Sequence, residues 1–166
     1  MKRSKVSHEF PPLVYSDSEI LILGSFPSVK SRAAKFFYGH PQNRFWRVLA
    51  SVYGENVPEQ AGEKKSLLKR HHVACYDVIE SCSIIGSSDS TIRNVQPADL
   101  QTIIAQGRIH RVILNGKTAA KYFERYHKRW DSQAIPVFQA PSTSPANAAT
   151  SLETLIQLWR PLLTQE

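Results

Sequence analysis

Short apolar runs that end at a small or polar residue constrain the fold of this chain most strongly. They contain little polar alternation, which is typical of parallel strands buried on both faces. They occur at residues 20–23, 73–78, 111–114 and 135–138. Apolar residues between and after these runs recur at helical spacing, which predicts intervening helices. We therefore expect an α/β fold, a three-layer α/β/α sandwich around a mostly parallel four-stranded central sheet.

The expected helices lie near residues 43–53, 62–71, 97–106, 117–126 and 148–163. A length of 166 residues fits a single domain, so we expect residues 1–166 to fold as one unit. Residues 1–12 are basic at their start and contain two consecutive prolines, which favours a flexible basic tail. No signal segment follows this start, and no apolar run approaches the ~20 residues that span a bilayer. We expect a cytoplasmic monomer with no membrane association.

The charge balance favours a polyanionic partner. The chain has 21 Lys and Arg against 14 Asp and Glu, a net charge of +7. Nucleic acid is the natural partner for such a chain, because no long amphipathic segment offers one basic face to a membrane. Two cysteines are too few for a disulfide scaffold or a four-thiolate cluster, and His71 and His72 have no partner at metal-ligand spacing. We expect neither a metal nor a cofactor.

The unusual sequence lies where the expected strands end. Residues 24–46, 77–91, 115–117 and 140–147 are rich in Ser, Gly, Pro, amides and aromatic residues. Sites in open α/β sheets form at the carboxyl ends of the strands, so these segments predict one shared site. Aromatic rings beside amides suit a pocket for a flipped base, although the rings could instead fold into the core. Two helix starts, near Asn43 and after residue 147, suit phosphate binding, or the polar residues there are simple N-caps.

Five segments carry a resemblance to a known family. They read GSFPS at 24–28, FYGHPQNRFW at 37–46, YDVIESC with GSSDS between 76 and 90, LNG at 114–116 and PSTSPAN at 141–147. In this order they resemble the uracil-DNA glycosylase superfamily, most closely its hypoxanthine-DNA (deoxyinosine) glycosylase branch. The resemblance spans nearly the whole domain. It implies a DNA glycosylase domain that removes deaminated bases, hypoxanthine above all, from DNA.

The sequence departs from the family pattern at two catalytic positions. Phe26 stands where better-known branches carry an Asp or Asn that positions the attacking water, and Ala140 stands where many carry a His. The resemblance to the hypoxanthine branch implies that the catalytic role has moved to Asn43. We expect its amide carbonyl to hold the water, while the alternative is that Asn43 only caps a helix.

The resemblance also implies a base pocket and a DNA-binding surface. Tyr38 would stack on the base or pack in the core, and Asp77 would read the base edge or remain a solvated carboxylate. His40 would donate to the departing base or bond to backbone, and Asn115 would line the wall or occupy a left-handed turn. The remaining expected pocket residues are Gly24, Ser25, Phe26 and Pro27. The expected contacts to the DNA backbone or lesion are Ser28, Lys30, Arg44, Ser142, Thr143, Ser144, Pro145 and Asn147.

Two alternatives to a hypoxanthine glycosylase remain open. One is a uracil or mismatch-specific glycosylase of the same fold, and the other is a non-catalytic DNA-binding module. Phe26 favours the second alternative, whereas Asn43 and the full pocket lining oppose it. Lys30, Lys35 and Lys117 have no local apolar setting that would activate an amine, so we expect a monofunctional enzyme without lyase activity.

Overall fold

The central sheet has the architecture that the apolar runs predict. The computed structural model describes residues 2–127 and 135–164. Four parallel strands form this sheet in the order β3-β2-β6-β7. Their bounds are Ile20–Gly24 for β2, Val73–Asp77 for β3, Arg111–Asn115 for β6 and Val137–Ala140 for β7. The α/β fold with a parallel four-stranded sheet is thereby confirmed.

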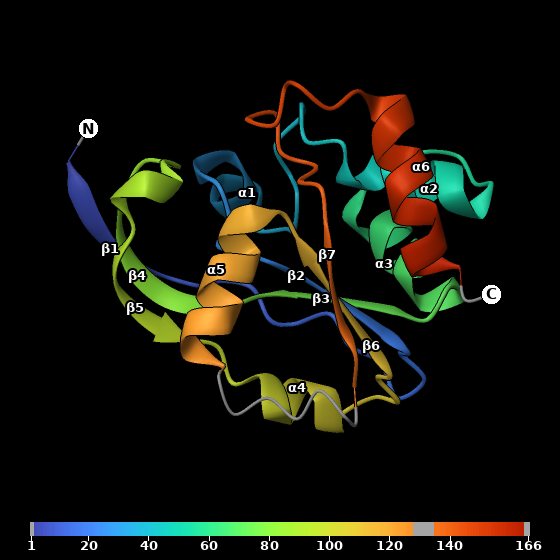
Figure 1. Cartoon of the computed structure of the whole chain (residues 1–166), viewed down its shortest axis with the longest axis horizontal. Helices are drawn as coiled ribbons and strands as arrows, with labels where there is room; N and C mark the ends of the chain where they lie inside the picture. The colour runs from blue at the N-terminus through green and yellow to red at the C-terminus, as the bar shows by residue number, and fades with distance from the viewer. Residues whose placement is uncertain (1, 128–134, 165–166) are drawn as a thin grey trace.

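Helices surround this sheet (Figure 1). In that view α2, α3 and α6 gather to one side of the strands and α5 lies on the other. Their bounds are Val29–Ala34 for α1, Phe45–Tyr53 for α2, Ala61–Arg70 for α3, Leu100–Ala105 for α4, Lys117–Tyr126 for α5 and Leu152–Leu163 for α6. None of the helices within the described part of the chain has the length and hydropathy of a membrane span.

A second, antiparallel sheet corrects the expectation of a flexible N-terminal tail. Strands β1 (Arg3–Ser7), β4 (Ile79–Ile85) and β5 (Arg93–Pro97) pair in the order β1-β4-β5. The expectation of a flexible tail over residues 1–12 is therefore wrong for Arg3–Ser7, because β1 pairs with β4 along its full length. Backbone pairing fixes such an edge strand even when most of its side chains are exposed, as they are in β1.

Three boundaries also differ from expectation. Helix α1 occupies part of the expected loop over 25–42, because Ser28 caps it by accepting a hydrogen bond from the Ser31 N–H at 3.1 Å. Strand β7 begins two residues later than the apolar run at 135–138 suggests. The last helix begins at Leu152 rather than Ala148, where Ser151 caps it through the Thr154 N–H.

The register of the central sheet brings the four strand ends together. Gly24 lies opposite Asp77, and Asn115 lies opposite Ala140. The interiors of β2, β3 and β6 are almost fully buried, whereas the edge strand β7 exposes Phe138 and Gln139 and so departs from the expectation of burial on both faces. The helices pack on the sheet through an apolar core that includes Phe45 and Trp159. The polar residues that end the strands therefore share one edge above a rigid core.

Candidate active site

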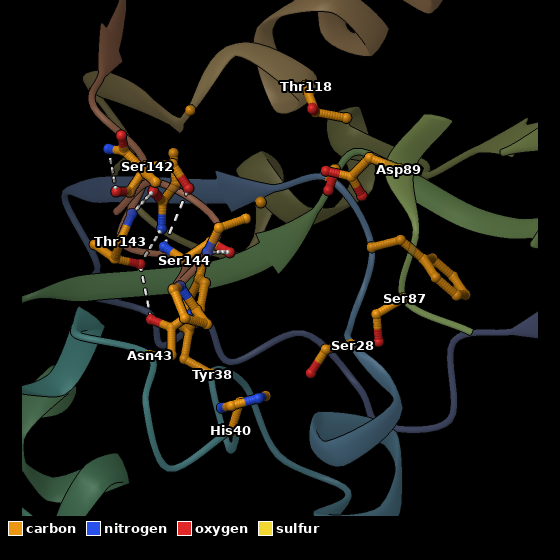
Figure 2. A pocket seen from close by; sticks show the side chains of 18 of the residues that line it. Ser28, Tyr38, His40, Asn43, Ser87, Asp89, Thr118, Ser142, Thr143 and Ser144 are labelled. Atoms are coloured by element: carbon orange, nitrogen blue, oxygen red, sulfur yellow. Dashed lines mark hydrogen bonds between the residues drawn. The ribbon is translucent and has the colours of Figure 1, made fainter. Parts of the chain in front are cut away.

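A cavity of about 1010 Å³ opens at this edge of the sheet. Figure 2 shows Asn43, Tyr38, Thr143 and Ser144 near one another, with Ser28 and Ser87 across the cavity from them. Most expected site residues line it: Gly24, Ser25, Phe26, Pro27, Ser28, Tyr38, His40, Asn43, Asp77, Asn115, Ser142, Thr143, Ser144, Pro145 and Asn147. Lys30 and Arg44 do not line it.

Asp77 and Tyr38 approach the backbone of Gly24 closely. A Cβ atom at residue 24 would lie 2.5 Å from Asp77 Oδ1 and 3.0 Å from the Tyr38 hydroxyl oxygen. Only glycine leaves room for both groups, so Gly24 allows a carboxylate and a phenol to share this wall of the cavity.

The ring of Tyr38 packs against another aromatic ring on one of its faces. The ring stacks on Phe45 with centroids 3.9 Å apart and an interplanar angle of 19°. Its hydroxyl is buried and makes no hydrogen bond of good geometry with the described residues, although the Asn115 side chain lies close enough to oppose the rise in its pKa. Burial, with the nearby Asp77 carboxylate, raises the pKa of Tyr38 well above its usual value, so the hydroxyl stays protonated. Tyr38 thus offers the cavity an aromatic surface and a neutral donor.

A directed chain of hydrogen bonds joins Asn115, Thr143 and Asn43. The Thr143 N–H donates to Asn115 Oδ1 at 3.0 Å, which identifies the other amide atom of Asn115 as nitrogen. That nitrogen donates to Thr143 Oγ1 at 3.0 Å, so the Thr143 hydroxyl must donate onward to Asn43 Oδ1, 2.8 Å away. The backbone N–H of Thr143 thereby sets the direction of the whole chain, and Figure 2 shows its last bond, between Thr143 and Asn43, as a dashed line.

This chain determines which part of Asn43 is free. Asn43 Oδ1 also accepts the Phe45 N–H at 2.9 Å, so both of its lone pairs are in use. Among the described residues, no group forms a hydrogen bond with its amide nitrogen Nδ2. The expectation that the carbonyl holds the water therefore needs revision, because the free group is the Nδ2 amide.

Arg44 and Thr143 stabilise the loop over 141–150, which lines the cavity. The Arg44 guanidinium donates to the carbonyl oxygens of Thr150, Ser144 and Asn147, the last at 2.9 Å. Thr143 is fully buried. Neither side chain is placed to bind DNA as the sequence suggested, and both instead fix the loop over 141–150.

Two serines of the same loop, Ser142 and Ser144, have hydroxyl groups that can donate a hydrogen bond to a ligand. Ser142 Oγ accepts the Ser144 N–H and Ser144 Oγ accepts the Ala146 N–H, each at 3.1 Å. Accepting leaves the O–H of each serine free to donate. The loop lies against Gly116, where a Cβ would come within 2.8 Å of Ser142 Cβ and where φ is +99°.

His40 and Phe26 line the cavity in different ways. His40 Nδ1 accepts the Gln42 N–H at 3.0 Å, so a neutral ring carries its proton on Nε2. Phe26 packs edge-on against His8, with the Arg32 guanidinium 5.8 Å from its ring centroid. His40 is thus a donor at the cavity, and Phe26 is an apolar wall.

The sequence did not single out His8. Its Nε2 lies 2.7 Å from Asp77 Oδ2, and its side chain is fully buried. Val6, His8 and Phe10 face inward while Ser7 and Glu9 are exposed. This alternation with a period of two is typical of extended backbone, and it would have predicted the extended segment that contains β1 and His8.

Asp89 and Thr118 were also missed, and both line the cavity. Burial raises the pKa of Asp89, and a hydrogen bond with Thr118 opposes that rise. Figure 2 shows the two side chains near each other, away from Asn43. Over residues 2–127 and 135–164, no group of three or more His, Cys, Asp or Glu side chains is arranged to hold a metal ion.

Comparison with known proteins identifies the family. A family model described as the uracil DNA glycosylase superfamily matches residues 11–163. The chain belongs to the uracil DNA glycosylase superfamily. Two curated relatives are named hypoxanthine DNA glycosylase. The one from Methanosarcina acetivorans is 36% identical over 121 residues, covering 70% of this chain and 75% of the relative. The one from Methanosarcina barkeri is 32% identical over 115 residues, covering 68% and 73%.

A solved structure of this superfamily has the same fold. It is a solution NMR structure from Methanosarcina acetivorans, described as a candidate uracil DNA glycosylase, with 31% identity and a TM-score of 0.75. The aligned region covers 93% of this chain and 97% of the chain in that structure. The family resemblance that the five motifs suggest is confirmed. In the protein described here, residues from all five motifs line the same cavity.

Proposed function

We propose that this protein is a DNA glycosylase that hydrolyses the N-glycosidic bond of deaminated bases, with hypoxanthine preferred, in base excision repair. The observation that carries the proposal is the cavity at the carboxyl edge of the sheet, where Tyr38, Asp77 and Asn43 converge. Two relatives named hypoxanthine DNA glycosylase support the choice of base. The net charge of +7 suits a DNA substrate.

The reaction begins with a base flipped out of the duplex. The base stacks on the free face of Tyr38, because Phe45 covers the other face. The glycosidic bond breaks through an oxocarbenium-like state, and the base leaves as an anion stabilised by hydrogen bonds. Water adds to C1′, and the proton that it loses neutralises the departed base anion. The lactam carbonyl of hypoxanthine carries that charge well. The Nε2–H of His40 and the Tyr38 hydroxyl, which its raised pKa keeps protonated, are donors available to stabilise that charge.

Asn43 orients the attacking water in this mechanism. Its free Nδ2 donates to the water oxygen and leaves a second lone pair of the water for C1′. A neutral amide is a poor base, so its contribution is orientation. The hydrogen bond from Thr143 and the bond to the Phe45 N–H keep the Asn43 side chain in one rotamer before substrate binds.

The enzyme leaves an intact abasic site. A lyase would need an amine that forms a Schiff base, activated by a lowered pKa. Among the described lining residues, Lys117 is the only lysine, and its side chain is exposed. Burial lowers the pKa of Lys64, but its amine lies over the rings of Phe36 and Trp46 and does not line the cavity.

The DNA backbone is bound by exposed cations and loop hydroxyls. Lys30 is exposed on α1, and the O–H groups of Ser142 and Ser144 are free to donate to phosphate. Ser28 and Pro145 line the same cavity, so they lie within reach of the strand that carries the flipped base.

The deciding experiment uses a duplex with one deoxyinosine. Purified protein is incubated with it, and abasic sites are then cut with hot alkali. A strand break at the inosine, absent from the undamaged duplex, is the expected result. No break at inosine, uracil or xanthine would contradict a glycosylase and favour a non-catalytic DNA-binding module.

Uracil is the second candidate substrate. The solved structure of a relative described as a candidate uracil DNA glycosylase favours it. The same assay on uracil opposite guanine or adenine separates the two, because our proposal predicts faster excision of hypoxanthine than of uracil.

A further inference from the structure

The Asp77 carboxylate has one oxygen bound to protein and one that is free. Oδ2 lies 2.7 Å from His8 Nε2, with the two side chains 6% and 0% exposed. Oδ1 lies beside the Gly24 backbone in the cavity wall, and no hydrogen bond to it is recorded among the described residues. A carboxylate oxygen that faces the cavity without a protein donor can accept a hydrogen bond from a ligand.

Among the described residues, the His8 side chain has no other polar contact that would explain its burial. An ionised carboxylate can only accept, so His8 Nε2 carries the hydrogen of this bond. Its Nδ1 is buried without a partner. The ring stacks on Tyr76 at 4.4 Å and meets Phe10 edge-on at 4.5 Å, which leaves it little freedom to turn away.

The fold places this ring through backbone pairing. Strand β1 pairs with β4 from Arg3 to Ser7, and the His8 N–H donates to the Glu80 carbonyl at 2.8 Å. Asp77 ends β3, and β4 begins two residues later. The pairing of β1 thus places His8 against Asp77, the carboxylate that borders Gly24.

We infer that His8 is a positioning residue for base recognition: it holds Asp77 so that Oδ1 accepts a hydrogen bond from the ring N–H of a lactam base. This inference rests on the proposed glycosylase function. Hypoxanthine offers such a donor at N1, next to its carbonyl. An unsubstituted purine offers a lone pair at N1 instead, which the carboxylate repels. A site built around a hydrogen bond rejects a substrate that lacks it much more strongly than an apolar pocket does.

The test compares hypoxanthine with unsubstituted purine in one duplex sequence. Single-turnover excision is measured at saturating protein for the parent, His8→Phe, His8→Gln and Phe10→Leu. His8→Phe keeps an aromatic ring but loses the donor, and His8→Gln keeps a donor. Phe10→Leu is the matched control, because Phe10 is buried in the same cluster and does not bond to Asp77. Melting temperatures are measured in parallel.

The parent should prefer hypoxanthine over purine by at least ~10-fold, the lower end for a hydrogen bond to a charged group. His8→Phe should lose about 10- to 100-fold of the hypoxanthine rate with little change for purine. His8→Gln should recover much of that preference. Phe10→Leu should lower the melting temperature and keep the preference of the parent.

Two results would overturn the inference while the proposed function stands. One is a parent that excises hypoxanthine and purine equally, which needs no variant to detect. The other is a hypoxanthine preference in His8→Phe that equals the parent's, or that falls equally in Phe10→Leu. If the parent excises no deaminated base at all, the proposed function itself fails.

Discussion

Replacing Asn43 by alanine separates a catalytic role from a structural one. The change removes the acceptor of the Phe45 N–H and of the Thr143 hydroxyl, at 2.9 and 2.8 Å. The loss of two hydrogen bonds, with a buried hydroxyl left unpaired, costs about 1–3 kcal/mol of folding free energy. For a chain of this size we expect the melting temperature to fall about 2–4 °C for each kcal/mol.

This destabilisation is too small to mimic a catalytic defect. Domains are stable by about 5–15 kcal/mol, so Asn43→Ala stays almost entirely folded at 25 °C. Loss of a positioning group should lower the excision rate at least ~10²-fold. Single-turnover excision of hypoxanthine at saturating protein, with DNA affinity measured separately, is the assay. We expect a strong fall in rate and nearly unchanged affinity.

Two further variants divide the roles of the Asn43 side chain. Asn43→Asp keeps an oxygen for the Phe45 N–H and the Thr143 hydroxyl, and its second oxygen can still hold water. It should therefore fold like the parent and excise faster than Asn43→Ala. Thr143→Val removes the hydroxyl and keeps the volume, so it should slow excision less than Asn43→Ala. If Asn43→Ala excises hypoxanthine within a few-fold of the parent, Asn43 is a helix-start residue only, and His40 or Asp77 becomes the next candidate.

Three other predictions concern lyase chemistry, DNA binding and the cysteines. Borohydride should trap no covalent adduct with inosine-containing DNA, and a trapped adduct would show that an amine attacks C1′. DNA affinity should fall steeply with salt, and Lys30→Ala should reduce the log–log slope by about 0.9, the loss of one phosphate contact. Arg44→Ala should leave that slope unchanged and lower the melting temperature, because Arg44 binds three loop carbonyls; a flatter slope in Arg44→Ala would return it to the DNA surface. Burial raises the pKa of both Cys75 and Cys82, so neither thiol of the native protein should react with iodoacetamide near pH ~8, where a free cysteine is partly ionised; mass spectrometry of native and unfolded samples checks this.

Local sequence determined the central sheet and the position of the site. The apolar runs before Gly24, after His72 and before Asn115 are too short for buried helices, and each strand ends at a small or polar residue. Because parallel strands end at one edge, the convergence of the segments that follow Gly24, Asp77 and Asn115 follows from the order of the elements. These features depend on composition and periodicity within about ten residues, which the sequence displays directly.

Tertiary structure decided the contacts between segments far apart in the chain. His8 reaches Asp77 across 69 positions, and Asn43 reaches Thr143 across 100. The sequence marked Asn43 and Asp77 but not their partners, and the family resemblance placed Arg44 and Thr143 among the DNA contacts. A residue's type fixes which hydrogen bonds it can make, whereas the packing of strands and loops decides which partner is within reach and which atom is left for the substrate.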